Sequence, residues 1–421
     1  MSPKIIHCAR FVLTHPEVLL ENAAVPVSED GRVLEPYSRS TIHTETGVET
    51  VDWGDAIILP GLVNAHTHLE LTILHRRLME FSSFTDWALQ LIHERRTWTP
   101  EDYHHSTEEG ARLALVSGTT LVGDIASGNG WNALSGDFPR RVVFQETLGL
   151  ASNLAEPAMA KIYALFNQYD IGTVRPLQVH TVSPHAPYST SGDLFRRAAA
   201  LAQSHKTPWT THIAETPEEL RFFETGDGEF REFLTRLDAL PENWRAPGAH
   251  PVAWLDALGI LGPSCLLAHC NYLNDDAITR IVRSKSSVVY CPRSHAFFDH
   301  ERHPVRQLLD AGVTVALGTD SLASNDSLSL IDEMRYLYAR RKDLTPEEIL
   351  RSATVHGAVA LGFSERLGRL APGFCADMTV LSLPSGIKSI RLTDQILEGA
   401  GDWRATIING RTVTVQKRLN S

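Results

Sequence analysis

Short apolar runs and helix-spaced apolar residues alternate through the middle of this chain. The apolar runs, which predict buried strands, cover residues 57–65, 119–125, 141–148, 177–183, 208–214, 265–270, 286–292 and 313–319. Apolar residues at helical spacing lie between them, over residues 84–96, 101–116, 191–204, 275–282, 328–340 and 346–361. Successive strand–helix units predict an α/β chain folded as a parallel (β/α)8 TIM barrel over residues 59–369. A doubly wound sheet is the alternative, but the glycine-rich turn that usually follows its first strand is absent.

The two ends of the chain have a different pattern. Residues 1–58 and 370–421 contain short β-type stretches, and Asn409-Gly410 predicts a hairpin turn. Neither end is long enough to bury a core alone, so we expect the two to pair into one small β-sandwich domain. Residues 222–252 form a polar insertion punctuated by Gly and Pro. This insertion predicts a loop that either covers the site or is an inert surface excursion.

Composition narrows the class of protein. The chain has 421 residues, of which 43% are apolar, and its formal net charge is −11. No cluster of Lys and Arg is present, and no apolar run approaches the roughly 20 residues that span a bilayer, so neither a nucleic-acid nor a membrane partner is expected. Five cysteines without regular spacing indicate a reduced, cytoplasmic protein. Of these, Cys270 and Cys291 are expected to be packed thiols rather than nucleophiles.

The first predicted barrel strand ends in a pair of histidines. His66 and His68 are two residues apart, so their side chains leave the strand in the same direction. Two imidazoles in this arrangement can share one metal ion. The pattern is short enough to arise by chance, so its interpretation depends on three later segments.

Each of these later segments puts a polar side chain at the end of a predicted strand. The residues are His212, His269 and Asp320. A parallel barrel keeps its chemistry at the carboxyl ends of its strands. We therefore predict that His66, His68, His212 and Asp320 bind one divalent cation, zinc in preference to iron. The predicted fourth strand contains no lysine that could bridge a second ion, which favours a single metal.

Two residues indicate acid–base chemistry beside this ion. Glu215 follows His212 by three residues, where a carboxylate can relay protons; the alternative is a charge at a helix N-terminus. His269 can stabilise developing charge; the alternative is a core histidine. Histidines in polar or helical contexts are expected to be solvated: His93, His104, His105, His205, His250, His300 and His303.

These motifs resemble the amidohydrolase superfamily, in the single-metal branch that contains cytosine deaminase, guanine deaminase, adenosine-type nucleoside deaminases and the s-triazine chlorohydrolases. The resemblance rests on residues 59–68, 212–216, 318–321 and 371–377 and covers essentially the whole chain. It implies that the four predicted ligands hold the metal and that Asp320 also takes the proton of the attacking water. It further implies that Glu215 shuttles protons, that His269 assists, and that His185 contacts substrate.

One position departs from this branch, which often reads Cys-Pro-x-Ser-Asn after the seventh strand. Here His295 replaces the final amide and follows Ser294, and both are candidate substrate contacts. The stretch 66–70, followed by 84–87, is similar to aminofutalosine deaminases. Glu70, Glu80 and Trp87 are further candidate contacts, although a core-facing aromatic is the alternative for Trp87.

The expected function is hydrolytic deamination of an aminopurine nucleoside, such as aminofutalosine, adenosine, methylthioadenosine or S-adenosylhomocysteine, with release of ammonia. Alternative reactions are displacement of chloride or amine from an s-triazine, deamination of guanine or cytosine, and ring-opening hydrolysis of a cyclic amide. A non-catalytic metal-binding scaffold is the alternative from another class. The zinc deaminases that use a P-C-x-x-C motif are excluded, because the chain has no such motif. A homodimer is the expected assembly.

Overall fold

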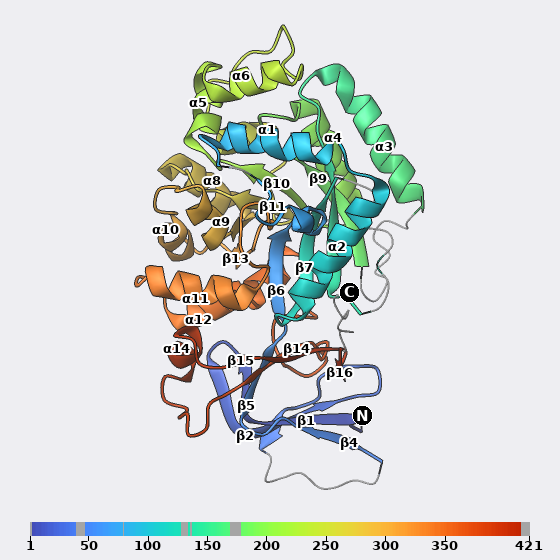
Figure 1. Ribbon diagram of the computed structural model, residues 1–421, viewed down its shortest axis with the longest axis vertical. Helices are drawn as coiled ribbons and strands as arrows, with labels where there is room; N and C mark the ends of the chain where they lie inside the picture. Colours follow the sequence, from blue (N-terminus) through green and yellow to red (C-terminus); the bar gives the residue numbers. More distant parts are fainter. Residues whose placement is uncertain are drawn as a thin grey trace.

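Two parallel four-stranded sheets form the centre of the molecule (Figure 1). The computed structural model describes residues 2–38, 47–78, 80–127, 134, 137–168 and 178–413. One sheet contains β6 (Leu62–Thr67), β7 (Thr119–Ala126), β8 (Arg140–Thr147) and β9 (Gln178–Pro184). The other contains β10 (Trp209–Ile213), β11 (Cys265–His269), β12 (Ser287–Tyr290) and β13 (Val315–Leu317). Each of these strands overlaps one of the predicted apolar runs, and neighbours in sequence are neighbours in each sheet.

The two central sheets meet at both of their edges. The backbone amide of His212 in β10 donates to the carbonyl of His185, just beyond β9, at 2.9 Å. At the other edge the amides of Thr319 and Asp320 both donate to the carbonyl of His66 in β6, at 3.1 Å. Because all these strands run parallel, their carboxyl ends lie on one side of the molecule.

Strands from both ends of the chain share a third sheet, as predicted. It contains β1 (Ile5–His15), β2 (Val18–Val27), β3 (Tyr37–Ser38), β4 (Glu49–Asp52), β5 (Ala56–Pro60), β14 (Met378–Ser382), β15 (Asp402–Ile408) and β16 (Arg411–Thr412). The join between the two ends is β5, which pairs with β1 and with β14. These strands are hydrogen-bonded into one continuous sheet, and the layering of a β-sandwich stays a prediction.

The predicted single strand over residues 57–65 is wrong. The structure divides it at Gly61, so that β5 belongs to the terminal sheet and β6 to a central sheet. A Cβ atom on Gly61 would lie 2.2 Å from Oγ1 of Thr120, which shows how closely the chain passes β7 at the crossing. Both halves are fully buried, so the apolar pattern continues through the break and gives no sign of it.

Helices surround the central sheets. They are α1 (Phe84–Arg95), α2 (Pro100–Leu115), α3 (Ala155–Gln168), α4 (Gly192–Ser204), α5 (Pro217–Thr225), α6 (Glu229–Arg236), α7 (Pro251–Ala257), α8 (Asp275–Ser284), α9 (Pro292–Phe297), α10 (Val305–Asp310), α11 (Leu330–Arg340), α12 (Pro346–Ser352), α13 (Val355–Ala360) and α14 (Leu392–Leu397). Short 3-10 turns, η2 (Leu69–Leu74) and η4 (Ser152–Leu154), follow β6 and precede α3. The helix predicted over 346–361 is two helices, because Thr354, with φ −132° and ψ −84°, breaks it.

The polar insertion over residues 222–252 is a long loop only over residues 237–250. It contains the end of α5 and all of α6, and both helices bury aromatic side chains. Phe222 and Phe230 are 0% and 1% exposed, and their rings lie 6.4 Å apart. The charged residues that suggested a loop are the outward faces of these short helices.

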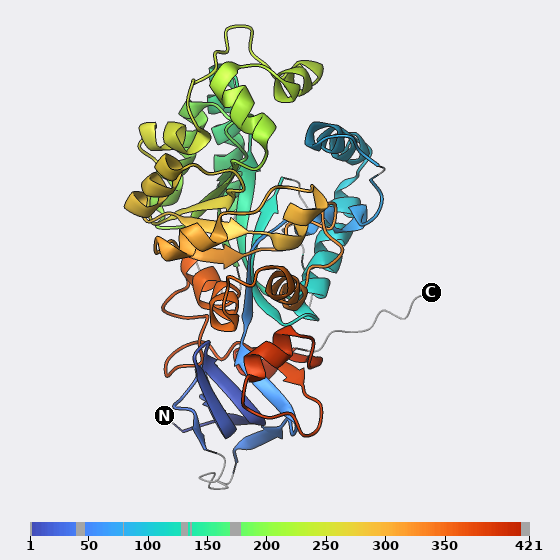
Figure 2. The same ribbon diagram turned by 90° about the vertical axis from the view of Figure 1, so that its left-hand side faces the viewer.

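The terminal sheet and helices α5 and α6 lie at opposite ends of the molecule (Figures 1 and 2). Strand β6, which follows β5 directly, leads from the terminal sheet into the centre. Among the described helices, none combines the length and the apolar composition that crossing a bilayer requires.

Candidate metal centre and active site

Four predicted metal ligands converge at the carboxyl ends of the central strands. Oδ1 of Asp320 lies 3.7 Å from Nε2 of His66 and 3.6 Å from Nε2 of His68. Nε2 of His212 lies 3.3 Å from Nε2 of His68. The ring of His269 joins the cluster, 5.3 Å from that of His66 between centroids. The hydrogen bonds described above, from the segment after β13 to β6 and from β10 to the segment after β9, bring these distant segments together.

The chemistry of this donor set fits a divalent cation. His66 is fully buried, and neither of its ring nitrogens has a hydrogen-bond partner among the described residues. Burial, together with the neighbouring imidazoles, holds the pKa values of His68 and His212 well below the ordinary value. Neutral imidazoles are the form that coordinates a metal. Three imidazoles and one carboxylate with converging lone pairs are a common ligand set for zinc.

Contacts behind the cluster orient its members. Nδ1 of His212 lies 2.9 Å from the carbonyl of His185, so it donates there and leaves Nε2 to face the cluster. Oδ2 of Asp320 accepts hydrogen bonds from Ser294 at 2.7 Å and from Ser324 at 2.9 Å. Ser294 is therefore buried against the carboxylate and does not line the cavity, unlike the contact predicted for it. Sequence reasoning missed Ser324, whose only signal is its position four residues after Asp320.

Glu215 and His269 lie side by side next to the predicted ligands. Oε1 of Glu215 is 3.5 Å from Nε2 of His269, and both side chains are buried. Burial, and then the charges of Asp320 and Glu219, raise the pKa of Glu215 well above its ordinary value. Burial lowers the pKa of His269 to about 3. The backbone amide of Glu215 donates to Glu219 at 2.8 Å, and this positioning contact also escaped the sequence analysis.

The strand ends at this site have unusual backbone angles. Ala214, His269 and Asp320 have φ values of 50°, 71° and 57°, in the left-handed region that residues other than glycine rarely occupy. Such strain persists where the surrounding structure holds it, and it concentrates at functional sites. Here it lies at or beside three of the clustered side chains.

A cavity of about 400 Å³ opens over this cluster. Its polar end is lined by His68, His212, Glu215, His269 and Asp320, as well as by His185. The predicted contact Trp87 also lines it, and its Nε1 donates to the carbonyl of Ala323 at 3.2 Å.

Two other predicted contacts do not line the cavity. Glu70 is buried and accepts a hydrogen bond from Arg95 at 2.8 Å, so Arg95 rather than Glu70 reaches the cavity wall. Glu80 is exposed and lies apart from the cluster. Arg95 and Glu146 line the cavity and were not identified from the sequence.

His295 belongs to a second group of histidines on the far side of His269. Its ring lies 5.4 Å from that of His300 and 5.8 Å from that of His303, and it does not line the cavity. The solvated position expected for His303 is wrong: it is 1% exposed, and its Nε2 contacts the carbonyl of His269 at 2.9 Å. His250 and His300 are half-buried rather than solvated, because each ring contacts Tyr272.

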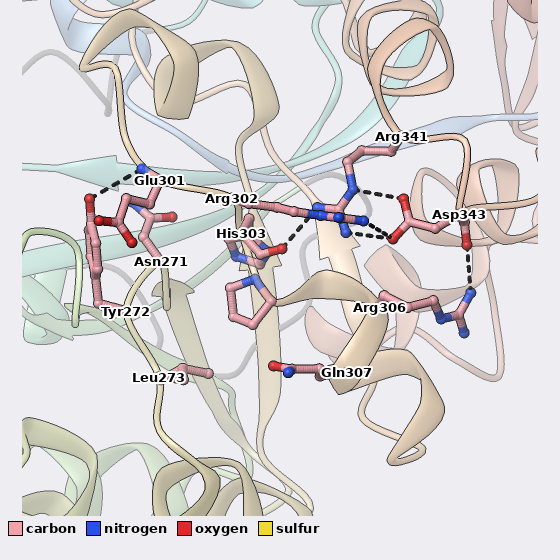
Figure 3. Close-up of a pocket in the computed structure, with 11 residues that line it drawn as sticks. Asn271, Tyr272, Leu273, Glu301, Arg302, His303, Arg306, Gln307, Arg341 and Asp343 are labelled. Carbon is pink, nitrogen blue, oxygen red and sulfur yellow. Dashed lines mark hydrogen bonds and ion pairs between the residues drawn. The ribbon is translucent and has the colours of Figure 1, made fainter.

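A second pocket, of about 440 Å³, is lined in part by His303 (Figure 3). Arg341 donates to the carbonyl of His303 at 2.8 Å and pairs with Asp343 at 2.9 Å. Arg302 pairs with the same carboxylate at 2.8 Å. Arg302, Arg341 and Asp343 of this pocket are therefore paired with one another, and His303 contacts the backbone carbonyl of His269.

The chain is similar to known proteins over most of its length. The Amidohydrolase family pattern matches residues 57–413. The chain is 29% identical to a 5-methylthioadenosine/S-adenosylhomocysteine deaminase of Syntrophobacter fumaroxidans, covering 96% of this chain and 94% of the relative. It is 30% identical to the protein of the same name from Nitratidesulfovibrio vulgaris, covering 87% and 80%.

Solved structures share the fold over nearly the whole chain. An adenosine deaminase of Xanthomonas campestris with bound zinc superposes with a TM-score of 0.81 at 26% identity, covering 98% of this chain and 93% of that one. The aminofutalosine deaminase of Helicobacter pylori gives 0.84 at 24% identity, covering 97% and 100%. Since the family pattern spans most of the chain and includes every clustered side chain, this protein belongs to the amidohydrolase family.

Proposed function

We propose that this protein is a metal-dependent hydrolytic deaminase of aminopurine nucleosides. The observation that carries the proposal is the buried pair of Glu215 and His269 at the polar end of a cavity, beside three imidazoles and a carboxylate. A protein that merely held a metal would need neither residue. The names of its relatives support deamination over the displacement of chloride from an s-triazine.

We propose zinc as the ion, held by His66, His68, His212 and Asp320. The donor set and the zinc in the related adenosine deaminase support this assignment. When bound, such an ion acts as a Lewis acid that lowers the pKa of a coordinated water to about 7. The strand that precedes His185 supplies no lysine to bridge a second ion, which supports a single metal.

Glu215 and His269, beside the proposed ion, have different roles in the proposed reaction. Glu215, when protonated, can deliver a proton to the ring nitrogen next to the carbon that carries the amine. The same carboxylate can then take up one proton of the attacking water and pass it to the departing amine, so that ammonia leaves, while the water's other proton, taken by Asp320, restores the protonated Glu215. Nε2 of His269 faces Glu215, where a neutral imidazole can hold the attacked carbon's oxygen by a hydrogen bond. The net reaction adds one water and releases one ammonia.

We further propose that the two central sheets are halves of one (β/α)8 barrel, with residues 59–369 as its span. The backbone hydrogen bonds at both edges and the fold of the related structures support this closure. Five free, buried cysteines support a reducing compartment, such as the cytoplasm. A homodimer stays a prediction, which sedimentation equilibrium would test.

The test is ammonia release by the zinc-loaded protein from adenosine, methylthioadenosine, S-adenosylhomocysteine, aminofutalosine, guanine, cytosine and an amino-s-triazine. Release from one or more of the nucleosides, and little from the free bases, is the expected result. No release from any nucleoside by folded, metal-loaded protein would overturn the proposal. Release from the triazine or from a free base alone would assign the site to that alternative.

A further inference from the structure

Away from the metal cluster, the wall of the cavity is apolar. Helix α1 contributes Phe84, Trp87 and Leu91, and α6 with its following turn contributes Phe233 and Leu237. These side chains form one surface, since Phe84 lies 5.6 Å from Trp87 and 6.1 Å from Phe230 of α6 between ring centroids. We call Phe84, Trp87, Leu91, Phe233 and Leu237 the apolar wall: all five line the cavity, and none is a predicted metal ligand.

The apolar wall continues to the opening of the cavity. Leu148 and Leu154 line the cavity and are 57% and 46% exposed. Leucine side chains that stay this exposed contribute little hydrophobic free energy to folding. A ligand that covers them would remove further apolar surface from water.

Among the described residues that line the cavity outside the metal cluster, no lysine or arginine is without an ionic partner. Among the described lining residues, Arg95 is the one Lys or Arg, and it pairs with Glu70 at 2.8 Å. Its Nε also donates to the hydroxyl of Tyr103 at 3.3 Å. The other charged lining groups are the carboxylates of Glu146 and Asp238.

The direction of a bound nucleoside follows from the proposed function. The amine of the purine has to reach Glu215 and His269, and the ribose lies at the opposite end of an adenosine molecule. Its 5′ substituent therefore points away from the cluster, along the apolar wall and toward Leu148 and Leu154. An apolar substituent would bury both its own surface and that of the wall. An amino-acid tail carries both an ammonium and a carboxylate group. The ammonium can pair with Glu146 or Asp238, but the carboxylate would lose water without a lysine or arginine that lacks a partner.

We infer that the site selects aminopurine nucleosides whose 5′ substituent is apolar where it meets the wall, such as an alkylthio or aryl group, over those with an amino-acid tail. This inference rests on the proposed function. It predicts that the protein distinguishes between methylthioadenosine and S-adenosylhomocysteine, the two compounds in the relatives' name. Unsubstituted adenosine fits the cluster but leaves the apolar wall uncovered.

The experiment compares kcat/KM of the zinc-loaded protein for three nucleosides. We expect methylthioadenosine to exceed adenosine about tenfold, the order that one or two buried apolar groups contribute. We expect it to exceed S-adenosylhomocysteine about 100-fold, because the tail's carboxylate stays unpaired. Equal or better use of S-adenosylhomocysteine would overturn the inference and leave the deaminase proposal intact. Failure with all three nucleosides would overturn the deaminase proposal itself.

A substitution tests the charge argument separately. Leu148→Arg places a cation at the exposed rim of the cavity and should reduce the preference for methylthioadenosine over S-adenosylhomocysteine about tenfold. The matched control, Leu148→Met, should keep the preference. Leu154→Arg serves the same purpose if Leu148→Arg does not fold. If both arginine variants fold and neither changes the preference for methylthioadenosine, the absence of a cation at the rim is not the cause of that preference.

Discussion

The hydroxyl of Ser294 donates a 2.7 Å hydrogen bond to Oδ2 of Asp320, the carboxylate oxygen that does not face His66 and His68. Ser324 donates to the same oxygen, and the two hydroxyls lie 3.0 Å apart. One oxygen of Asp320 is thus held by the protein while the other points at the imidazoles. Hydrogen bonds of this kind orient a metal ligand.

Removing these hydroxyls should loosen the metal centre. We expect Ser294→Ala combined with Ser324→Ala to lower zinc affinity about 10- to 100-fold, because Asp320 loses both donors. Competition with a fluorescent chelator measures the affinity. Ser204→Ala, at the exposed end of α4, is the control. Unchanged affinity in the double variant would show that the two serines do not position the carboxylate.

Glu215→Gln should separate catalysis from metal binding. The amide keeps the size of the side chain but cannot donate a carboxylic proton, so ammonia release should fall by about 100- to 10,000-fold. The zinc content should stay at that of the unaltered protein, since Glu215 is not among the proposed ligands. Glu224→Gln, an exposed position on α5, is the control for both measurements. Full activity in Glu215→Gln would remove this residue from the proposed mechanism.

A buried ion pair joins β7 to β8 beneath the site. Arg141 and Asp124 have side chains 0% and 1% exposed, and Asp124 also accepts the backbone amide of Leu69. Arg141→Met should lower the free energy of unfolding by about 3–5 kcal/mol, because it leaves the buried carboxylate of Asp124 without its ionic partner.

Adding Asp124→Asn to Arg141→Met should restore part of this loss, since the stranded charge is removed. Urea unfolding gives the comparison. Arg112→Met is the control, because its pair with Glu109 is about a third exposed and should contribute less than about 1 kcal/mol. Equal costs for the buried and exposed pairs would contradict the prediction.

His295 should make the protein less stable in mild acid. Burial lowers the pKa of His295 to about 4, against 6.5 for an ordinary histidine. Between these values the unfolded chain binds more protons than the folded one, so stability falls as the pH falls. For this group alone the loss reaches about 2 kcal/mol at pH 5.

His295→Asn removes the titrating ring. Relative to the unaltered protein, we expect the variant to gain about 2 kcal/mol between pH 7 and pH 5 in the free energy of unfolding, measured with urea. His205→Asn, at an exposed position, shows the effect of removing an imidazole in general. A gain no larger than that of the control would show that the buried ring of His295 does not cause the acid sensitivity.

Strand and ligand positions were predictable because they depend on local patterns. Each predicted apolar run overlaps an observed central strand, and His66, His68, His212 and Asp320 all lie at strand ends. Parallel strands bring their carboxyl ends to one side, so residues far apart in sequence meet without any further information. The errors at Gly61 and Thr354 arose where two buried elements follow one another without a change in apolar pattern.

Contacts to the substrate could not be predicted in this way. Ser294 and His295 are adjacent, yet Ser294 holds Asp320 while His295 packs against His300, because a helical turn points neighbouring side chains in different directions. Glu70 was chosen for its position after His68, but its partner Arg95 comes from a separate helix.

The residue pattern alone therefore predicted the central strands and the candidate ligands at or just beyond their ends, since each of these depends on residue type and spacing within one segment. Only the tertiary structure decides which side chains surround the cavity, which charges there are already paired, and which histidines are buried. These properties depend on distances between segments that no local pattern encodes. The apolar wall is an example, because Phe84 and Phe233 come from helices more than a hundred residues apart and meet only after folding.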